Sequence, residues 1–338
     1  MADRELPAGP GRRARAPRRR RARLASGAPL LAAALLLVGC TAPTATSGAA
    51  PARAAKPTPT PTPQGPYVAL GDSYTSGLDI PDPVGSPAGC DRSSRNYPSL
   101  VARYFKLGPS EVHDVSCSGA TTGDLSSPQS TQDGSNPAQL SSVDAGTALV
   151  TVGIGGNDID FTGILTHCVA LDALGDVVGK LHHFADEDAP CRAYYTDDGT
   201  DQIGQRIGAT ATALAGVLAR IRQLAPHSRV FVVGYPDLLP TADSAGCAHV
   251  LGVTAADVDY LNGEEVQLNR VLQQQARAAG DVYVDTYTPS RGHDACAARA
   301  TRWIEPLFPD AAAAPMHPNA VGQQGIATAV EHSIAAAY

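Results

Sequence analysis

The segment Tyr67–Tyr74 is the feature that most limits how this 338-residue chain folds. Its first four residues, Tyr-Val-Ala-Leu, form an apolar run typical of a buried strand, and they lead directly into Gly71-Asp72-Ser73. Glycine and aspartate predict a sharp turn there, so the serine lies where a helix begins. Free backbone N–H groups at a helix N-terminus favour developing negative charge. The segment therefore predicts a serine nucleophile for acyl transfer, although Gly-Asp-Ser alone is also an ordinary turn sequence.

Short apolar runs alternate with longer helical stretches along the rest of the chain. Apolar residues at helical spacing predict a helix over residues 207–225, and a pattern resembling a capping box at 254–257 predicts another that ends near 279. A last helix is expected to begin near Asn319. The alternation predicts an α/β domain with a parallel sheet covered on both faces, and active sites form at the carboxyl ends of such strands. The predicted strands are residues 67–70, 112–115, 148–152, 230–233 and 282–284.

Three further polar motifs follow predicted strands or precede a helix. Gly119, in Cys-Ser-Gly-Ala-Thr, can turn its backbone N–H toward a bound oxygen because it has no side chain in the way. Asn157, in Gly-Gly-Asn-Asp, carries an amide that can donate to an oxyanion, and its glycine-rich surroundings lack the spacing of a phosphate-binding loop. His317, in Met-His-Pro-Asn, is placed to act as a base. With Ser73, these residues predict one hydrolytic site.

These four residues, in this order, match the residues that name the SGNH, or GDSL, hydrolases. The chain resembles this family over residues 67–338. It is most similar to the secreted actinobacterial esterases and lipases, which share three sequential disulfides and a Gly-His-Asp-x-Cys stretch, found here at residues 292–296. The resemblance implies a three-layer, flavodoxin-like fold with a five-stranded parallel sheet of order 2-1-3-4-5. It also implies that the chain hydrolyses carboxylic esters without a metal or cofactor.

The resemblance assigns a role to each site residue. It implies that Ser73 forms the acyl-enzyme, that His317 is the base, and that the oxyanion hole consists of the N–H groups of Ser73 and Gly119 with the Asn157 amide. The family usually has an aspartate three residues before the histidine, but this sequence has Ala314 there. Some relatives use a main-chain carbonyl instead of the acid. We therefore predict that the Ala314 carbonyl accepts the Nδ1 hydrogen of His317.

The N-terminal 66 residues predict export rather than a folded part of the domain. Residues 1–40 combine an arginine-rich start, a short apolar run and Leu-Val-Gly-Cys40, which resembles the lipobox of a bacterial lipoprotein. Cys40 would then carry lipid, although an ordinary signal peptide that ends near a cysteine is an alternative. Residues 41–66, rich in Pro, Thr and Ala, predict a disordered linker. We expect residues 67–338 to be a monomeric catalytic domain that is lipid-anchored outside the cell membrane or secreted.

The cysteine content agrees with export, and the net charge argues against one class of partner. The first 39 residues hold nine arginines and two acidic residues, so the remainder carries about −14 at pH 7, against −7 for the whole chain. Such an acidic domain argues against nucleic-acid binding. Beyond Cys40 there are six cysteines, which allow three disulfides in an exported chain and fifteen possible pairings. Our prediction is that neighbours pair, as Cys90–Cys117, Cys168–Cys191 and Cys247–Cys296.

Two other functions remain open at this point. A carbohydrate acetylesterase would use the same site, although Trp303 is the only tryptophan and an extended sugar-stacking platform is not expected. A surface lipoprotein with a silent hydrolase fold would bind a ligand without catalysis, and the complete set of site residues argues against it. We expect an extracytoplasmic serine esterase or lipase that acts on ester substrates ranging from short acyl esters to lipids.

Overall fold

The computed structural model describes residues 63, 65–178, 188–241 and 244–338. The predicted signal peptide, Cys40 and nearly all of the predicted linker lie outside this part of the chain. The described residues belong to one unit, Thr58–Tyr338. Within them, none of the helices combines the length and the apolar character needed to cross a bilayer.

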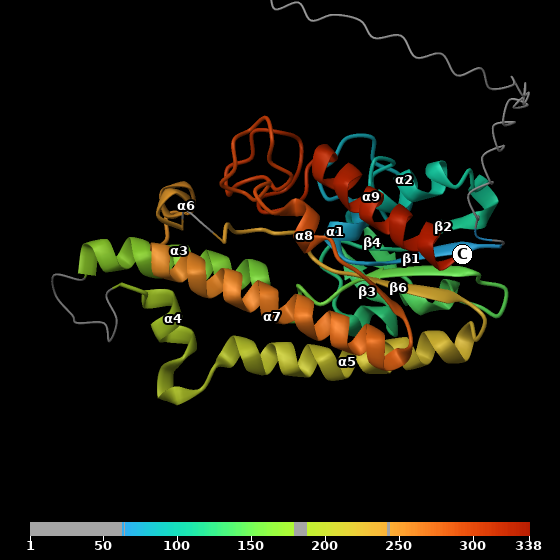
Figure 1. The fold of residues 1–338 in the computed structure, drawn as a ribbon, viewed down its shortest axis with the longest axis horizontal. Helices are drawn as coiled ribbons and strands as arrows, with labels where there is room; N and C mark the ends of the chain where they lie inside the picture. Colours follow the sequence, from blue (N-terminus) through green and yellow to red (C-terminus); the bar gives the residue numbers. More distant parts are fainter. Residues whose placement is uncertain (1–62, 64, 179–187, 242–243) are drawn as a thin grey trace, which may run out of the picture. The chain divides into compact units, whose positions relative to one another are not determined.

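A five-stranded parallel sheet forms the centre of the domain (Figure 1). The strand order is β2-β1-β5-β6-β7, which corresponds to 2-1-3-4-5 when these five strands are numbered among themselves. Both the predicted strands and the order implied by the family resemblance are confirmed. Gly71 is paired with Gly153, so β1 and β5 end side by side at the same edge of the sheet. The strands are β1 (Tyr67–Gly71), β2 (Val112–Asp114), β5 (Leu149–Gly153), β6 (Arg229–Val233) and β7 (Val282–Val284).

Helices cover both faces of this sheet. α2 and α9 lie on one face, whereas α5 and α7 lie on the other (Figure 1). The three predicted helices correspond to α5, α7 and α9. The long helices are α2 (Tyr97–Tyr104), α3 (Phe161–Val178), α5 (Gln202–Leu224), α7 (Ala255–Ala279) and α9 (Ala320–Ala337). Shorter elements are α1 (Ser73–Ser76), α4 (Pro190–Tyr195), α6 (Ser244–Leu251), α8 (Tyr287–Ser290) and an antiparallel hairpin of β3 (Gln129–Thr131) and β4 (Gly134–Asn136).

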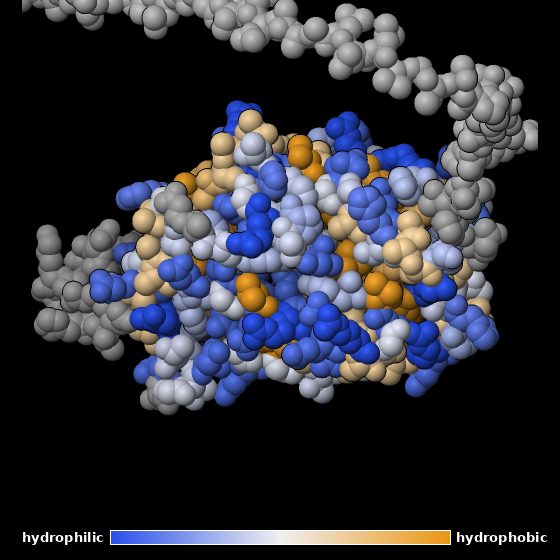
Figure 2. Space-filling model, viewed as in Figure 1, coloured by the Kyte–Doolittle hydropathy of each residue, from blue (hydrophilic) through white to orange (hydrophobic). Residues whose placement is uncertain are grey.

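Side chains of β1 alternate between two apolar cores. Tyr67 and Ala69 belong to the core shared with α2 and α9, whereas Val68 and Leu70 belong to the core shared with α5 and α7. All four side chains are fully buried. Burial on both faces explains why the sequence of this strand is a continuous apolar run rather than an alternating one. On the outside, polar residues cover most of the face shown in Figure 2, and apolar residues form separate spots.

Helix α7 begins at the predicted cap, but the carboxylate of Asp257 binds the start of α4 instead of the cap residue. The Thr254 hydroxyl accepts the backbone N–H of Asp257 at 3.1 Å, as expected for an N-cap. The Asp257 carboxylate accepts the backbone N–H groups of Cys191 and Arg192, at 3.0 and 2.9 Å. The residue therefore joins the start of α4 to α7. The three disulfides have the predicted pairing, Cys90–Cys117, Cys168–Cys191 and Cys247–Cys296.

Candidate active site

The turn after β1 places Ser73 at the carboxyl end of the sheet. A Cβ atom at Gly71 would lie 2.2 Å from Thr75 Oγ1, so only glycine fits where the chain leaves the strand. The amide of Gln139 accepts from the Gly71 N–H at 2.8 Å and donates to its carbonyl at 2.9 Å. Asp72 then caps α1 by accepting the backbone N–H of Tyr74. Ser73 is thus the first residue of a helix, as predicted.

The side chains of Ser73 and His317 meet although 244 residues separate them in the sequence. Ser73 Oγ lies 2.7 Å from His317 Nε2, and His317 Nδ1 lies 2.7 Å from the carbonyl oxygen of Pro315. A carbonyl can only accept, so Nδ1 carries the hydrogen and Nε2 is left to accept the serine proton. Both side chains are buried, with 5% and 9% exposed.

The prediction that the Ala314 carbonyl orients the imidazole is wrong. That carbonyl accepts the backbone N–H of His317 at 3.1 Å and closes the turn that carries the histidine. The ring reaches the carbonyl of the next residue, Pro315, instead. Met316 has φ of 58°, and this backbone conformation folds the ring back toward Pro315. Among the described residues, no carboxylate is hydrogen-bonded to the imidazole.

The surroundings of His317 keep the imidazole neutral. Burial lowers the pKa of His317 below its usual value, and the Pro315 carbonyl and the negative charge of Asp79 oppose this shift without reversing it. The Tyr74 ring packs against the imidazole with 4.7 Å between ring centroids. The Tyr74 hydroxyl donates to the carbonyl of Met316. The imidazole of His317 is therefore held both by its own loop and by Tyr74, the residue that follows Ser73.

Asn157 borders the same cavity as Ser73 and His317. Its Nδ2 donates one hydrogen to the carbonyl of Ala120 at 2.9 Å, which leaves the second hydrogen of this nitrogen for the cavity. The Asp158 carboxylate accepts the backbone N–H of Thr122 at 3.0 Å. Two adjacent side chains thus tie the segment after β5 to the segment that contains Gly119.

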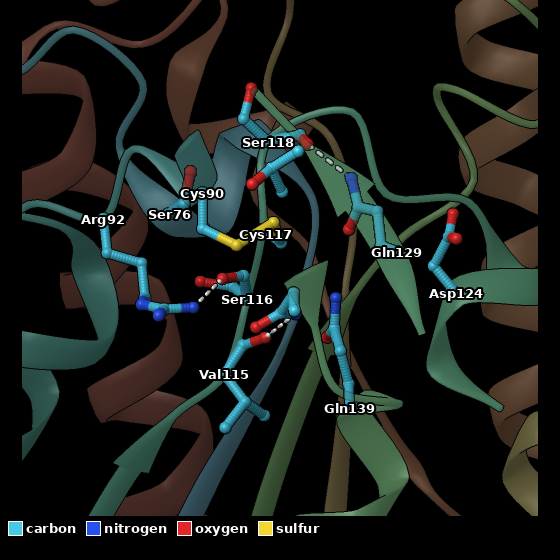
Figure 3. The surroundings of a disulfide bond; sticks show 12 residues. Ser76, Cys90, Arg92, Val115, Ser116, Cys117, Ser118, Asp124, Gln129 and Gln139 are labelled. Carbon is cyan, nitrogen blue, oxygen red and sulfur yellow. Dashed lines mark hydrogen bonds between the residues drawn. A yellow bond between two sulfur atoms is a disulfide. The ribbon is translucent and has the colours of Figure 1, made fainter. Parts of the chain in front are cut away.

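Gly119 lies beside this cavity rather than in its lining. It immediately precedes Ala120, the residue that Asn157 contacts, and its φ of 75° is one that favours glycine. Two positions earlier, Cys117 is fixed by its disulfide with Cys90 (Figure 3). Arg92 and Gln129 donate to main-chain carbonyls of the same segment, each at 2.7 Å (Figure 3). In the described part of the chain, neither the Ser73 N–H nor the Gly119 N–H has an acceptor.

A small cavity of about 30 Å³ opens beside the Ser73–His317 pair. Most of its walls are apolar, and the carboxyl groups of Asp72 and Glu265 also border it. Burial, and after it the negative charge of Asp237, raises the pKa of Glu265 well above its usual value. Among the described residues, no group of three or more His, Cys, Asp or Glu side chains is arranged to hold a metal ion. The apolar walls are formed by Ile159, Phe161, Leu238 and Leu268.

The structure also shows a site residue that the sequence did not indicate. Glu305 is 1% exposed and holds the loop of His317 without touching the imidazole. Its carboxylate accepts from the Asp310 N–H at 2.9 Å and from Asn319 Nδ2 at 2.8 Å, and it pairs with Arg302. Its backbone N–H donates to the His317 carbonyl at 3.0 Å. No motif marks this residue, because its partners are spread over a loop whose shape the sequence does not reveal.

The sequence matches the model of the GDSL-like Lipase/Acylhydrolase family over residues 69–324. The chain belongs to this family. It is 37% identical over 293 residues to Lipase 2 of Streptomyces coelicolor, covering 86% of this chain and 89% of the relative. It is 31% identical over 281 residues to Lipase 1 of the same organism, covering 83% and 89%.

Two solved structures share this SGNH hydrolase fold. Phospholipase A1 from Streptomyces albidoflavus is similar with a TM-score of 0.62 and 27% identity, over 80% of this chain and 99% of that chain. The extracellular lipase from Streptomyces rimosus is similar with a TM-score of 0.58 and 27% identity, over 80% and 100%. Family, relatives and fold agree that the chain is a carboxylic ester hydrolase of the lipase and esterase class.

Proposed function

We propose that this protein is an extracytoplasmic serine esterase or lipase that forms an acyl-enzyme on Ser73. The observation that carries the proposal is the 2.7 Å contact between Ser73 Oγ and His317 Nε2 at the mouth of an apolar cavity. As the hydroxyl attacks the ester carbonyl, Nε2 takes its proton and then delivers it to the leaving alcohol. Water, activated by the same nitrogen, hydrolyses the acyl-enzyme.

The oxyanion of each tetrahedral intermediate needs donors that are already in place. The free N–H groups of Ser73 and Gly119 and the second Nδ2 hydrogen of Asn157 supply three. Preorganised donors of this kind are effective because they do not reorganise during the reaction, and losing one typically costs about 10²–10³ in kcat. The disulfide and the side chains of Arg92 and Gln129 keep the Gly119 segment in position.

The walls of the cavity favour an aliphatic acyl group. Ile159 from the turn before α3, Phe161 at the start of α3 and Leu268 from α7 give it an apolar surface, which excludes water from a bound acyl chain. The printed names of the relatives, lipases and a phospholipase A1, agree with acyl esters as substrates. We infer that the enzyme cleaves fatty acyl esters in preference to acetylated polysaccharide.

The location proposed for the enzyme rests on the sequence and one relative. Three disulfides are expected in an oxidising compartment, and one of the similar structures is described as an extracellular lipase. Cys40 would carry the lipid, residues 41–66 would form the tether, and the domain would act as a monomer. Replacing Cys40 by Ala in the expressing bacterium tests the anchor. We expect ester-hydrolysing activity to move from the membrane fraction to the medium, and an unchanged distribution would contradict lipid anchoring.

The catalytic proposal is tested with p-nitrophenyl esters from acetate to palmitate, phospholipid and acetyl-xylan. We expect Ser73→Ala and His317→Gln each to lower kcat/KM by at least about 10³, with folding unchanged by circular dichroism. Ser333→Ala, which removes a hydroxyl bonded only to its own helix, is the matched control. Equal activity of Ser73→Ala and wild type would exclude this nucleophile. Preferential deacetylation of acetyl-xylan would instead identify a carbohydrate esterase.

A further inference from the structure

Tyr235 lies just beyond the end of β6 and borders the cavity, with 4% of its surface exposed. Its hydroxyl reaches two separate parts of the site. It lies 2.5 Å from Asp72 Oδ2 and 2.7 Å from the backbone nitrogen of Gly156. Nothing in the family pattern of four residues points to this side chain.

The direction of both hydrogen bonds follows from their chemistry. A backbone N–H can only donate, so the Tyr235 hydroxyl accepts from Gly156. Its own hydrogen is then donated to Asp72 Oδ2. The phenol oxygen therefore links the residue before Ser73 to the residue before Asn157. These two segments follow β1 and β5 and are 84 positions apart in the sequence.

Tyr235 is itself held firmly from two sides. Asn269 of α7 accepts its backbone N–H at 2.8 Å and donates to its carbonyl at 3.0 Å. Its ring meets the ring of Tyr74 edge to face, with 5.1 Å between centroids. A Cβ atom at Gly156 would lie 3.1 Å from the hydroxyl, so a larger residue there would push against it. The Tyr235 side chain that links Asp72 to Gly156 is therefore fixed in place by its surroundings.

We propose that Tyr235 is a positioning residue for the reaction proposed above, on which this inference rests. Its hydroxyl sets the position of the Asn157 donor relative to the Ser73 nucleophile. Ala120 fixes the Asn157 side chain from one direction, and the Gly156 N–H fixes the adjoining backbone from the other. An oxyanion donor acts through its placement, so losing either restraint weakens stabilisation of the transition state.

Tyr235→Phe removes the hydroxyl and leaves the ring. With p-nitrophenyl butyrate we expect kcat to fall by about 10- to 100-fold while KM changes by less than about twofold, because the restraint matters only when the oxyanion forms. Phosphonylation of Ser73 by a p-nitrophenyl phosphonate, which places negative oxygen at the same donors, should slow by a similar factor. Tyr67→Phe is the matched control. It loses a fully buried hydroxyl bonded to Thr151 at 2.8 Å, on the opposite face of the sheet, and should leave kcat unchanged.

A double variant separates positioning from a structural role. If Tyr235 acts through Asn157, then Tyr235→Phe should add little to the loss caused by Asn157→Ala, because the restraint has no donor left to position. Fully multiplicative losses would overturn the proposal. So would a kcat for Tyr235→Phe equal to that of Tyr67→Phe while Ser73→Ala is inactive. Activity in Ser73→Ala would contradict the proposed function instead, so the two failures are distinguishable.

A second variant keeps the tyrosine, in case Tyr235→Phe does not fold. Gly156→Ala adds one methyl group against the hydroxyl and displaces the same N–H. We expect the same pattern, a lower kcat with little change in KM. A kcat equal to that of wild type in folded Gly156→Ala would overturn the proposal.

Discussion

The Pro315 carbonyl lies 2.7 Å from His317 Nδ1, in the position that a carboxylate occupies in a Ser-His-Asp triad. A carbonyl dipole fixes the tautomer of the ring, but it carries no full charge. It therefore stabilises the imidazolium less than an aspartate would. Because burial also disfavours the charged ring, the two effects together keep the base neutral over a wider range of pH.

The first prediction concerns the acid limb of the pH profile. His317 must be neutral to accept a proton, and burial lowers its pKa below the usual value of 6.5. We therefore expect the limb of kcat/KM that follows His317 to have its midpoint below pH 6.5, with activity rising as pH increases through it. The ¹³Cε1 shift of His317, followed by NMR against pH, measures this pKa directly.

Asp72 needs a separate control, because burial raises its pKa to about 7 in spite of the opposing hydrogen bonds from Tyr235 and Tyr74. The Asp72→Asn variant removes this titration and should retain the limb that belongs to His317. A His317 pKa of 7 or more in the free enzyme would contradict the weak stabilisation attributed to the Pro315 carbonyl.

The second prediction compares two disulfides. Replacing both Cys90 and Cys117 by Ala opens a cross-link between residues 27 positions apart and should destabilise the domain by about 2–5 kcal/mol. It should also lower kcat by about 10-fold or more, because the Gly119 segment, which we propose supplies an oxyanion donor, loses its restraint. Thermal unfolding and p-nitrophenyl butyrate kinetics at a temperature where the protein is folded measure the two effects.

The Cys247–Cys296 pair provides the control for that experiment. It lies at α6 and the 292–296 stretch, and neither cysteine borders the cavity beside Ser73. Replacing both by Ala should lower the melting temperature and leave kcat of the folded enzyme unchanged. An equal loss of kcat in the two double variants would show that the first disulfide has no special role at the site.

The sequence predicted the framework well because that framework depends on local patterns. β1 could be recognised from a run of four apolar residues, all of them buried in the structure, and α7 from the four-residue pattern at 254–257. The convergence of Ser73 and His317 was predicted from family motifs at strand and helix ends. The position of the accepting carbonyl was missed by one residue, because turn closure by Ala314 depends on backbone angles that the residue types do not specify.

Side chains that support the site from a distance could not be predicted in the same way. Gln139 binds both main-chain groups of Gly71 across 68 residues, and Tyr235 reaches Asp72 across 163. Each is a common residue type in a segment without a motif. Their roles follow only from the register of the sheet, which brings the ends of β1, β5 and β6 together.

The third prediction concerns Glu305. Glu305→Gln leaves the buried Arg302 guanidinium with only the more exposed Asp310 as an ionic partner and should cost about 2–5 kcal/mol of stability. Since the loop of His317 loses its anchor, kcat should also fall, with KM little changed. Glu111→Gln, which affects only a hydrogen bond to the Gly108 N–H, is a control that should change neither by much.

Glu305 should also affect how the stability of the protein changes with pH. Burial alone would raise the pKa of Glu305, but hydrogen bonds from Asn319, the Asp310 N–H and Arg302 outweigh it and hold the pKa below the usual value of 4.5. Its contribution is therefore complete above pH 4.5 and is lost as pH falls through the lower pKa of the folded state. Glu305→Gln should make the melting temperature less sensitive to pH in this range. A variant whose acid sensitivity equals that of wild type would contradict this assignment.

The fourth prediction compares two glycines that differ in the space available for an added methyl group. At Gly71 an added methyl group would overlap Thr75 Oγ1 at 2.2 Å and the Gly153 carbonyl at 2.6 Å, and both neighbours are fixed by the strand-to-helix turn. Gly71→Ala should therefore abolish folding or cost more than about 3 kcal/mol, and it should reduce activity even where some folded protein remains. Gly208, in the exposed part of α5, has nothing within 4 Å of an added Cβ, so Gly208→Ala should stabilise the protein by about 0.5–1 kcal/mol. Urea unfolding of both variants tests the contrast, and a Gly71→Ala protein as stable and active as wild type would show that the turn can move without disturbing Ser73.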